Sequence, residues 1–154
     1  MTELKIKKPF PTALASIDDF RKSKYFKSAT DIASFRCKGK DCGCGGNLRI
    51  YKTLLDLLDE SRKNAGIPYV TLSGCRCCKH NNKVSKNKNS DHVSNKTGLV
   101  CCGVDIRARN DKERFLIVSA SLKVGFDRIG INYEQNFIHL GLSYRNEPTV
   151  IWRY

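Results

Sequence analysis

Residues 73–106 read SGCRCCKHNNKVSKNKNSDHVSNKTGLVCCGVDI, and residues 137–143 read FIHLGLS. These two stretches hold all three histidines of the chain. Two of them, His92 and His139, are candidate site residues together with a carboxylate, Asp105, that stands between apolar neighbours. The second stretch alternates at the period of a β-strand, so its aliphatic residues are expected to face the core while His139 projects from the opposite face. One histidine is therefore expected on a rigid strand and the other in a polar loop.

These three side chains suit a catalytic metal site. A catalytic zinc ion is typically held by three protein ligands, and its fourth tetrahedral position stays open. His92, Asp105 and His139 would supply two neutral nitrogens and one anion, which leaves the metal a net positive charge and a good Lewis acid. A carboxylate between two apolar residues also needs a partner that offsets its desolvation, unless it faces solvent. Taken alone, His139 is equally well explained by a hydrogen bond on a half-exposed sheet face, and His92 by solvation.

Hydrophobic periodicity predicts two main helices. In residues 48–65, apolar side chains recur at three- and four-residue steps, and Gly66 and Pro68 then end the helix. Residues 110–125 predict the second helix, which begins with a capping box of Asn110 and Glu113. Its inward stripe is predicted to consist of Phe115, Val118, Ser119 and Leu122.

The remaining elements predict the α+β class. Strands are expected at 69–72, 128–132, 136–143 and 149–153, the last three in an antiparallel sheet, and 73–103 is expected to be mostly loop. A connection of that length is uncommon unless it is functional. Residues 1–30 are interpreted as an irregular leader with one helical turn at 17–22, and residues 31–154 as a single domain. The predicted architecture is two helices against a small antiparallel sheet, with long loops over one face.

The chain is strongly basic, because 28 basic side chains stand against 15 acidic ones and give a formal net charge of +13. This surplus favours polyanionic partners such as nucleic acid, anionic lipid or anionic cell-wall polymers. The basic clusters are not interleaved with aromatic residues as in a single-strand platform, so nucleic acid is the weaker choice. No apolar run is long enough to span a membrane, and the N-terminus lacks the apolar segment of a signal peptide. We therefore expect synthesis in the cytosol.

Eight cysteines fall into three groups along the chain. The groups are Cys37, Cys42 and Cys44; Cys75, Cys77 and Cys78; and Cys101 and Cys102. Reduced thiols are the default without a signal peptide. Two interpretations stay open: a structural metal ion that joins the first group to a thiol near Cys77 or Cys78, or disulfides formed in an oxidising environment. The two C-x-x-C pairs of a zinc ribbon are absent, so spacing does not decide between them.

Taken in order, SGCR, HN, S-x-H, GVDI and F-I-H resemble the D-Ala-D-Ala carboxypeptidase and L-alanyl-D-glutamate endopeptidase family of zinc peptidases. The pattern of that family is roughly S-G-Y-R…H-N…S-x-H-x-x-G-x-A-x-D-I…H, and the resemblance covers about residues 35–143. It implies a fold shared with hedgehog signalling domains, with long loops over a metal cleft. It also implies one catalytic Zn²⁺, held by His92, Asp105 and His139.

The resemblance assigns roles to three further residues of the SGCR and S-x-H motifs. Arg76 would hold a substrate carboxylate or carbonyl near the metal, because its planar fork matches a carboxylate. Ser73 would serve the turn that aims Arg76, and Ser90 would orient the loop of His92. An ion pair for Arg76, and ordinary turn roles for the two serines, are the alternatives.

The chain departs from the family pattern in three places. His92 and Asp105 are thirteen positions apart, farther than in the pattern, so the extra residues must loop out, which is thermodynamically cheap. Cys75 replaces the tyrosine of SGYR, and Gly141 stands where many relatives carry an acid.

The mechanism implied by the resemblance still needs a general base beside the metal. Glu134, five residues before His139, is the predicted base, although a solvated turn glutamate explains it equally well. Asp127 and Asp91 are the weaker candidates.

The implied activity is hydrolysis of a peptide bond in murein stem peptides, by a phage- or prophage-type lysin or a cell-wall carboxypeptidase. Positive charge would attach the protein to anionic cell-wall polymers after its release to the bacterial wall or periplasm. Two other functions stay open: a catalytically inactive relative that acts as a structural or binding subunit, and a basic nucleic-acid-binding protein with cysteine-bound zinc.

Overall fold

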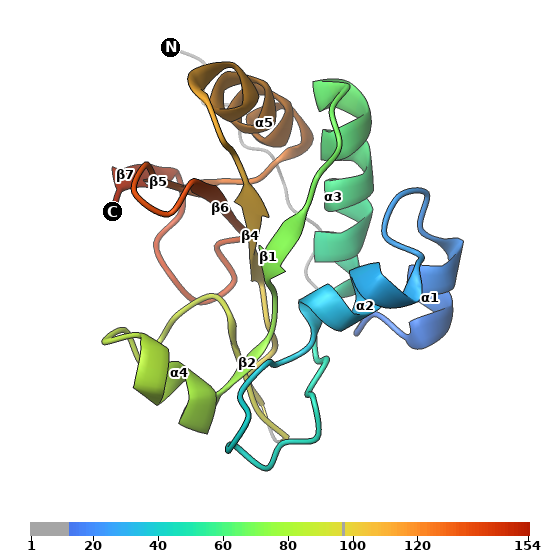
Figure 1. Cartoon of the computed structure of the whole chain (residues 1–154), viewed down its shortest axis with the longest axis vertical. Helices are drawn as coiled ribbons and strands as arrows, with labels where there is room; N and C mark the ends of the chain where they lie inside the picture. Colours follow the sequence, from blue (N-terminus) through green and yellow to red (C-terminus); the bar gives the residue numbers. More distant parts are fainter. Residues whose placement is uncertain (1–12, 97) are drawn as a thin grey trace.

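The computed structural model describes residues 13–96 and 98–154, and it is organised around a five-stranded sheet (Figure 1). The strands are β1 (Thr71–Ser73), β4 (Gly103–Arg107), β5 (Arg128–Asn132), β6 (Phe137–Gly141) and β7 (Val150–Arg153). They lie in the order β1-β4-β6-β5-β7. All neighbours are antiparallel except β5 and β7, which are parallel, so the predicted sheet is confirmed but for its edge strand.

Two helices, α3 (Lys52–Ala65) and α5 (Asp111–Val124), lie side by side in Figure 1. Each ends at a glycine in the left-handed conformation, Gly66 with φ 67° and Gly125 with φ 109°, where a side chain would be strained. The core between these helices and the sheet contains fully buried aliphatic residues that stand at alternate positions of β4 and β6. These residues are Val104, Ile106, Ile138 and Leu140.

The predicted inward stripe of α5 is wrong. Phe115 is 70% exposed and Leu122 is 43% exposed, whereas Ile117, Ala120 and Ser121 are buried. The reason is close packing of α5 on α3 through small residues, where the hydroxyl of Ser121 lies 2.9 Å from that of Ser61. A helix that buries small and polar residues lacks the strong apolar periodicity on which the prediction relied.

Residues 13–30, which fall in the expected irregular leader at 1–30, contain regular structure. They form α1 (Ile17–Lys22) and the start of α2 (Ala29–Phe35), each begun by a serine in a capping box. Phe20 and Phe26 are fully buried, and both rings stack edge-on against Phe35, with centroids 5.2 and 5.6 Å away. Residues 13–30 therefore belong to the folded domain, and the first twelve residues of the expected leader lie outside the described residues.

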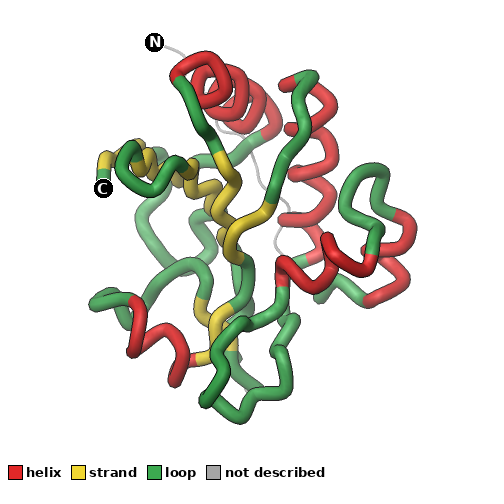
Figure 2. Tube along the Cα trace, in the orientation of Figure 1, coloured by secondary structure: helices red, strands yellow, loops and turns green. Residues whose placement is uncertain are grey.

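The segment expected to be mostly loop at 73–103 contains three short elements: β2 (Arg76–Cys77), α4 (Cys78–Val84) and β3 (Val93–Ser94). Strands β2 and β3 pair in parallel, while much of the segment around α4 is loop in Figure 2. The extra residues between His92 and Asp105 do loop out: the carboxamide oxygen of Asn95 accepts from the amides of residues 98 and 99, after which the chain returns to β4. Among the described residues, no helix has the length and apolar character that a membrane span requires.

Candidate metal centre

Asp105 and His139 are direct partners across β4 and β6 and project from the sheet face opposite the aliphatic core. Directly opposed side chains on one face of a sheet lie within contact distance of each other. Asp105 is 4% exposed and His139 is 3% exposed, so neither is a solvated surface residue. Strand pairing therefore brings together two residues that are far apart in the sequence.

His92 joins this pair from the start of β3. The parallel pairing of β2 and β3 positions it, because the backbone carbonyl of His92 accepts from the amide of Arg76 at 2.8 Å. The His92 ring donates its Nδ1 proton to the carbonyl oxygen of Gly74 at 2.7 Å. The other ring nitrogen, Nε2, is then the unprotonated one, and it faces Asp105 and His139.

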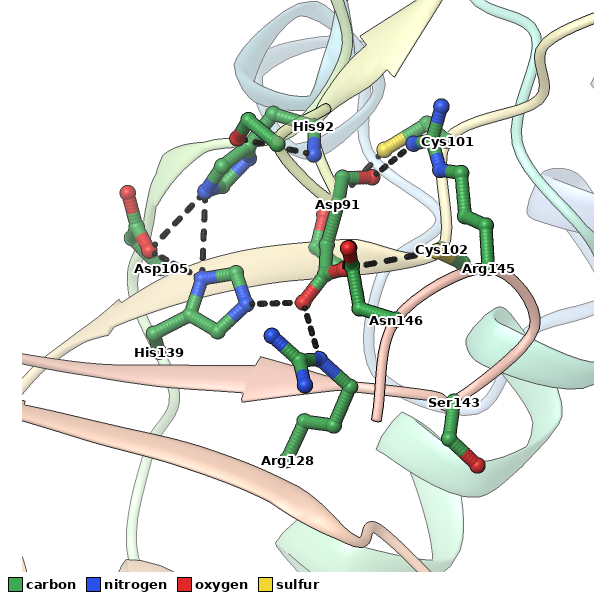
Figure 3. A network of polar contacts seen from close by, with 12 residues as sticks. Asp91, His92, Cys101, Cys102, Asp105, Arg128, His139, Ser143, Arg145 and Asn146 are labelled. Atoms are coloured by element: carbon green, nitrogen blue, oxygen red, sulfur yellow. Dashed lines mark hydrogen bonds and ion pairs between the residues drawn. The ribbon is translucent and has the colours of Figure 1, made fainter. Parts of the chain in front are cut away.

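Three potential ligand atoms converge at one point (Figure 3). His139 Nδ1 lies 3.1 Å from His92 Nε2 and 2.9 Å from Asp105 Oδ1, and His92 Nε2 lies 3.2 Å from the same oxygen. Ligands about 2.0–2.1 Å from a tetrahedral zinc ion are separated by only slightly more, roughly 3.4 Å. The donor set of two imidazoles and one carboxylate, all buried, fits a catalytic zinc ion with an open position.

Asp91 fixes the orientation of His139 (Figure 3). The Nε2–H of His139 donates to Asp91 Oδ2 at 3.0 Å, which leaves Nδ1 as the ligand nitrogen. The same oxygen accepts from Nε of Arg128 at 3.0 Å, and Oδ1 accepts from the carboxamide of Asn146 at 2.6 Å. A carboxylate behind a metal-binding histidine fixes its tautomer and raises its basicity. From the sequence, Asp91 is only a weak candidate base, because nothing in its local pattern indicates a contact with His139.

The charges of the site favour ionised carboxylates. Burial opposes ionisation of Asp105 and Asp91, but the histidines outweigh it and hold the pKa of each carboxyl well below its usual value, with Arg128 also helping Asp91. Burial would likewise lower the pKa of His139, yet the hydrogen bonds and charges of Asp105 and Asp91 raise it to about 9. Burial lowers the pKa of His92. The pocket between the three ligand atoms thus attracts positive charge, either a proton on His139 or a cation.

The three ligands lie in an open, mostly polar cavity of about 530 Å³. Arg76 lines this cavity, and its Nη2 lies 3.3 Å from Asp105 Oδ2, the oxygen that faces away from the histidines. Its Nε donates to Ser73 Oγ at 3.2 Å, so Ser73 holds the side chain of Arg76. Arginine therefore orients the ligand carboxylate and also presents positive charge to a bound molecule.

The two other predicted site residues lie at different distances from this centre. Ser90 lines the cavity, and its hydroxyl accepts from the backbone amide of His92 at 3.4 Å. Glu134 lies in the turn between β5 and β6, and its side chain is exposed. It is not among the residues that line the cavity, although its neighbour Gln135 is.

The weaker candidate base Asp127 is placed away from the ligands. Its carboxylate accepts from the backbone amide of Ser143 at 3.0 Å and from the Ser143 hydroxyl at 2.6 Å. Asp127 does not line the cavity.

Comparison with protein families gives a match over most of the chain. The family model described as Peptidase M15 matches residues 25–141, which include all three ligands, Arg76 and the cavity-lining turn before β6. The comparisons with curated proteins and with solved structures found no match. The family consists of zinc peptidases that act on cell-wall peptides. With a matched segment that covers most of the chain, and with the zinc-type donor set in it, this chain belongs to the peptidase M15 family.

Proposed function

We propose that this protein is a zinc-dependent hydrolase of murein stem peptides, of the lysin or cell-wall carboxypeptidase kind. The observation that carries the proposal is the convergence of His92 Nε2, Asp105 Oδ1 and His139 Nδ1 within 3.2 Å of one another. Each ligand side chain makes a further hydrogen bond, with Gly74, Arg76 or Asp91, through an atom that does not face the metal position. These bonds preorganise the metal-facing atoms. The centre lies in an open cavity, as a catalytic rather than a structural site requires.

When bound, zinc supplies Lewis acidity and lowers the pKa of a bound water to about 7. The protein side chains would do the rest. Arg76 binds a carboxylate or carbonyl oxygen of the substrate, and its second role, the contact with Asp105, keeps that ligand in place. Glu134 is the proposed base, which takes a proton from the attacking water and passes it to the leaving amine. Gln135 of the same turn and Asn132 at the end of β5 both line the cavity, which supports this placement.

The lining of the cavity suits a peptide that carries free carboxylates. Arg76, Lys86 and Arg128 line it with positive charge, while Trp152 and Tyr154 of the C-terminal segment add aromatic surface. A stem peptide offers both amide groups and carboxylates to such a surface. The formal charge of +13 supports attachment to anionic wall polymers, and we propose the bacterial wall or periplasm as the place of action.

The test is digestion of purified murein followed by mass spectrometry of the fragments. The wild-type protein should create new peptide termini, a chelator should abolish them, and added zinc should restore them. Asp105→Asn should remove the activity, while Asp56→Asn, an exposed position on α3, serves as the matched control. The masses of the fragments identify the bond that is cut, and so separate an endopeptidase from a carboxypeptidase.

A second function, zinc binding without catalysis, is favoured by one observation. Among the described residues, Asp91 and Asp105 are the only carboxylates that line the cavity, and both are engaged with histidines and arginines. A binding or structural subunit would hold zinc at His139 yet produce no new termini from any murein. That outcome would reject the hydrolase and retain the metal centre.

A further inference from the structure

We propose that this chain holds a second, structural zinc ion on four cysteine thiolates, Cys37, Cys42, Cys44 and Cys77. The Sγ atoms of all four lie within 4.8 Å of one another. Three of them come from the loop after α2, and the fourth comes from the end of β2, forty residues farther along. The site is separate from the His–Asp–His centre, and no ligand is shared between the two.

The spacing of the sulfur atoms suits a tetrahedral zinc ion. With a Zn–S bond of about 2.3 Å, the six S···S edges of a tetrahedron are roughly 3.8 Å long. Cys37 Sγ lies 3.9 Å from Cys42 Sγ, and Cys42 Sγ lies 3.2 Å from Cys44 Sγ. Small movements within the loop would equalise these edges, because Cys42 and Cys44 are only partly buried.

Backbone amides donate hydrogen bonds to three of the four sulfur atoms, which suits thiolates. The backbone amide of Cys77 donates to Cys37 Sγ at 3.4 Å, that of His80 to Cys77 Sγ at 3.4 Å, and that of Asn47 to Cys44 Sγ at 3.5 Å. Such contacts are stronger when the acceptor is ionised. The fourth sulfur, Cys42 Sγ, instead donates to the carbonyl oxygen of Gly39 at 3.2 Å, and it must turn away from this oxygen when it is ionised.

The loop geometry and the nearby charges fit the same site. Gly43 and Gly45 both have φ 68°, which lets the chain turn sharply on either side of Cys44. A zinc ion with four thiolates carries a net charge of −2, and binding releases four thiol protons. Lys79 and Lys96 line the space beside the cluster and would offset that charge.

The other four cysteines take no part. Cys78 is exposed, although it directly follows a ligand, and Cys75, Cys101 and Cys102 are buried elsewhere in the core. No pair within the cluster is disulfide-bonded, since all eight thiols are free. Of the two interpretations that the cysteine spacing left open, the arrangement favours the metal ion and selects Cys77 over Cys78.

The cluster connects the loop after α2 to the end of β2, next to a residue that lines the cavity. Cys77 directly follows Arg76 in β2, and its sulfur also caps α4 by accepting from the amide of His80. A metal ion bound here would cross-link the loop after α2 to β2, the strand that carries Arg76. We assign the ion a structural role, because four protein ligands leave no open position for substrate.

The deciding experiment compares two adjacent substitutions. Cys77→Ser removes a ligand while serine keeps the helix cap, and Cys78→Ser is the matched control at the exposed neighbour. Metal content is measured on the full-length protein by elemental analysis and native mass spectrometry. We expect two zinc ions per chain in the wild-type protein and in Cys78→Ser, and one in Cys77→Ser.

A second pair of measurements keeps this inference independent of the catalytic centre and of folding failures. The His139→Ala variant should lose the catalytic ion and keep the thiolate ion, whose cobalt-substituted form shows sulfur-to-metal charge-transfer bands in the near ultraviolet. Alkylation of the denatured, unreduced wild-type protein should modify all eight cysteines. A disulfide among the four, iron in place of zinc, or a zinc content unchanged by Cys77→Ser would overturn the inference.

Discussion

Gly141 leaves the space that the carboxylate of Asp91 occupies: a β-carbon at position 141 would lie 2.6 Å from Asp91 Oδ2 and 3.0 Å from His139 Nε2. Gly103, the partner of Gly141 across β4 and β6, is equally tight against Asp91 and His139. The family resemblance implies an acid at the position of Gly141, two residues after the last histidine. In this chain the carboxylate that accepts from His139 Nε2 comes from elsewhere in the sequence. It belongs to Asp91, the residue before His92.

Gly141→Ala should therefore weaken zinc binding. The added methyl group must displace Asp91 from His139, and loss of such a carboxylate contact typically costs about 10–100-fold in metal affinity. Competition with a chromogenic chelator measures the affinity. Gly98→Ala is the control, because a β-carbon there meets no atom within 4 Å. Equal zinc affinity in the two variants would show that Asp91 does not support the ligand.

Asp91 and Glu134 should give opposite patterns when each is made neutral. Glu134→Gln is expected to lower kcat by about 10²–10⁴-fold, the usual contribution of a general base, and to leave zinc affinity unchanged. Asp91→Asn should instead lower zinc affinity by about 10–100-fold, because its carboxylate bonds a ligand histidine. Glu60→Gln, at an exposed position on α3, controls for loss of surface charge.

Steady-state kinetics at saturating zinc distinguishes the two roles. If Asp91→Asn abolishes turnover with zinc fully bound while Glu134→Gln is as active as the control, Asp91 is the base and the assignment of Glu134 is wrong.

Arg76→Lys should reduce kcat/KM although it preserves the charge. Lysine carries its donors on a single nitrogen, which cannot take the places of both Nε beside Ser73 and Nη2 beside Asp105. The planar guanidinium group makes both contacts and keeps a further donor for a substrate carboxylate. Loss of one hydrogen bond to a charged group, worth about 1.5–3 kcal/mol, corresponds to roughly 10–100-fold. Arg109→Lys, at an exposed position, is the control. Unchanged kinetics in Arg76→Lys would leave Arg76 with only a structural ion pair.

Local sequence signals were sufficient to predict the bounds of several elements, although not the buried face of α5. The α1 and β5 segments were predicted at their observed bounds, and the second helix was predicted to within one residue at each end. Alternation in residues 137–143 also placed Ile138 in the core and His139 on the other face. These features depend on neighbours along the chain, which a single sequence displays directly.

Contacts between distant segments could not be predicted in the same way. The pairing of Asp105 with His139 depends on the register of β4 against β6, and the support of His139 by Asp91 depends on two glycines that only the folded sheet brings near. Helix α4 was missed because its cap is a cysteine, Cys77, rather than a serine or aspartate. The ligand residues were recognised through the family pattern, and their geometry required the fold.

Zinc binding at the His–Asp–His centre should strengthen as pH rises toward about 9. His139 has a pKa of about 9 without zinc, so at pH 7 it carries a proton that must leave before Nδ1 can bind the metal. The pKa of His92 is lowered and that of Asp105 is also lowered, so both are already unprotonated near pH 7. Only one proton is therefore released for each zinc ion bound, and affinity should rise about tenfold per pH unit between 7 and 9.

Calorimetry in buffers of different ionisation enthalpy counts these protons, and the Cys77→Ser background restricts the count to this centre. Asp91→Asn removes one of the two carboxylates that raise the pKa of His139, so in that variant the rise in affinity should level off at a lower pH. An affinity that does not change between pH 7 and 9, or release of no proton, would mean that His139 is already neutral in the zinc-free protein. In that case the pocket between the ligands would hold no positive charge before the metal arrives.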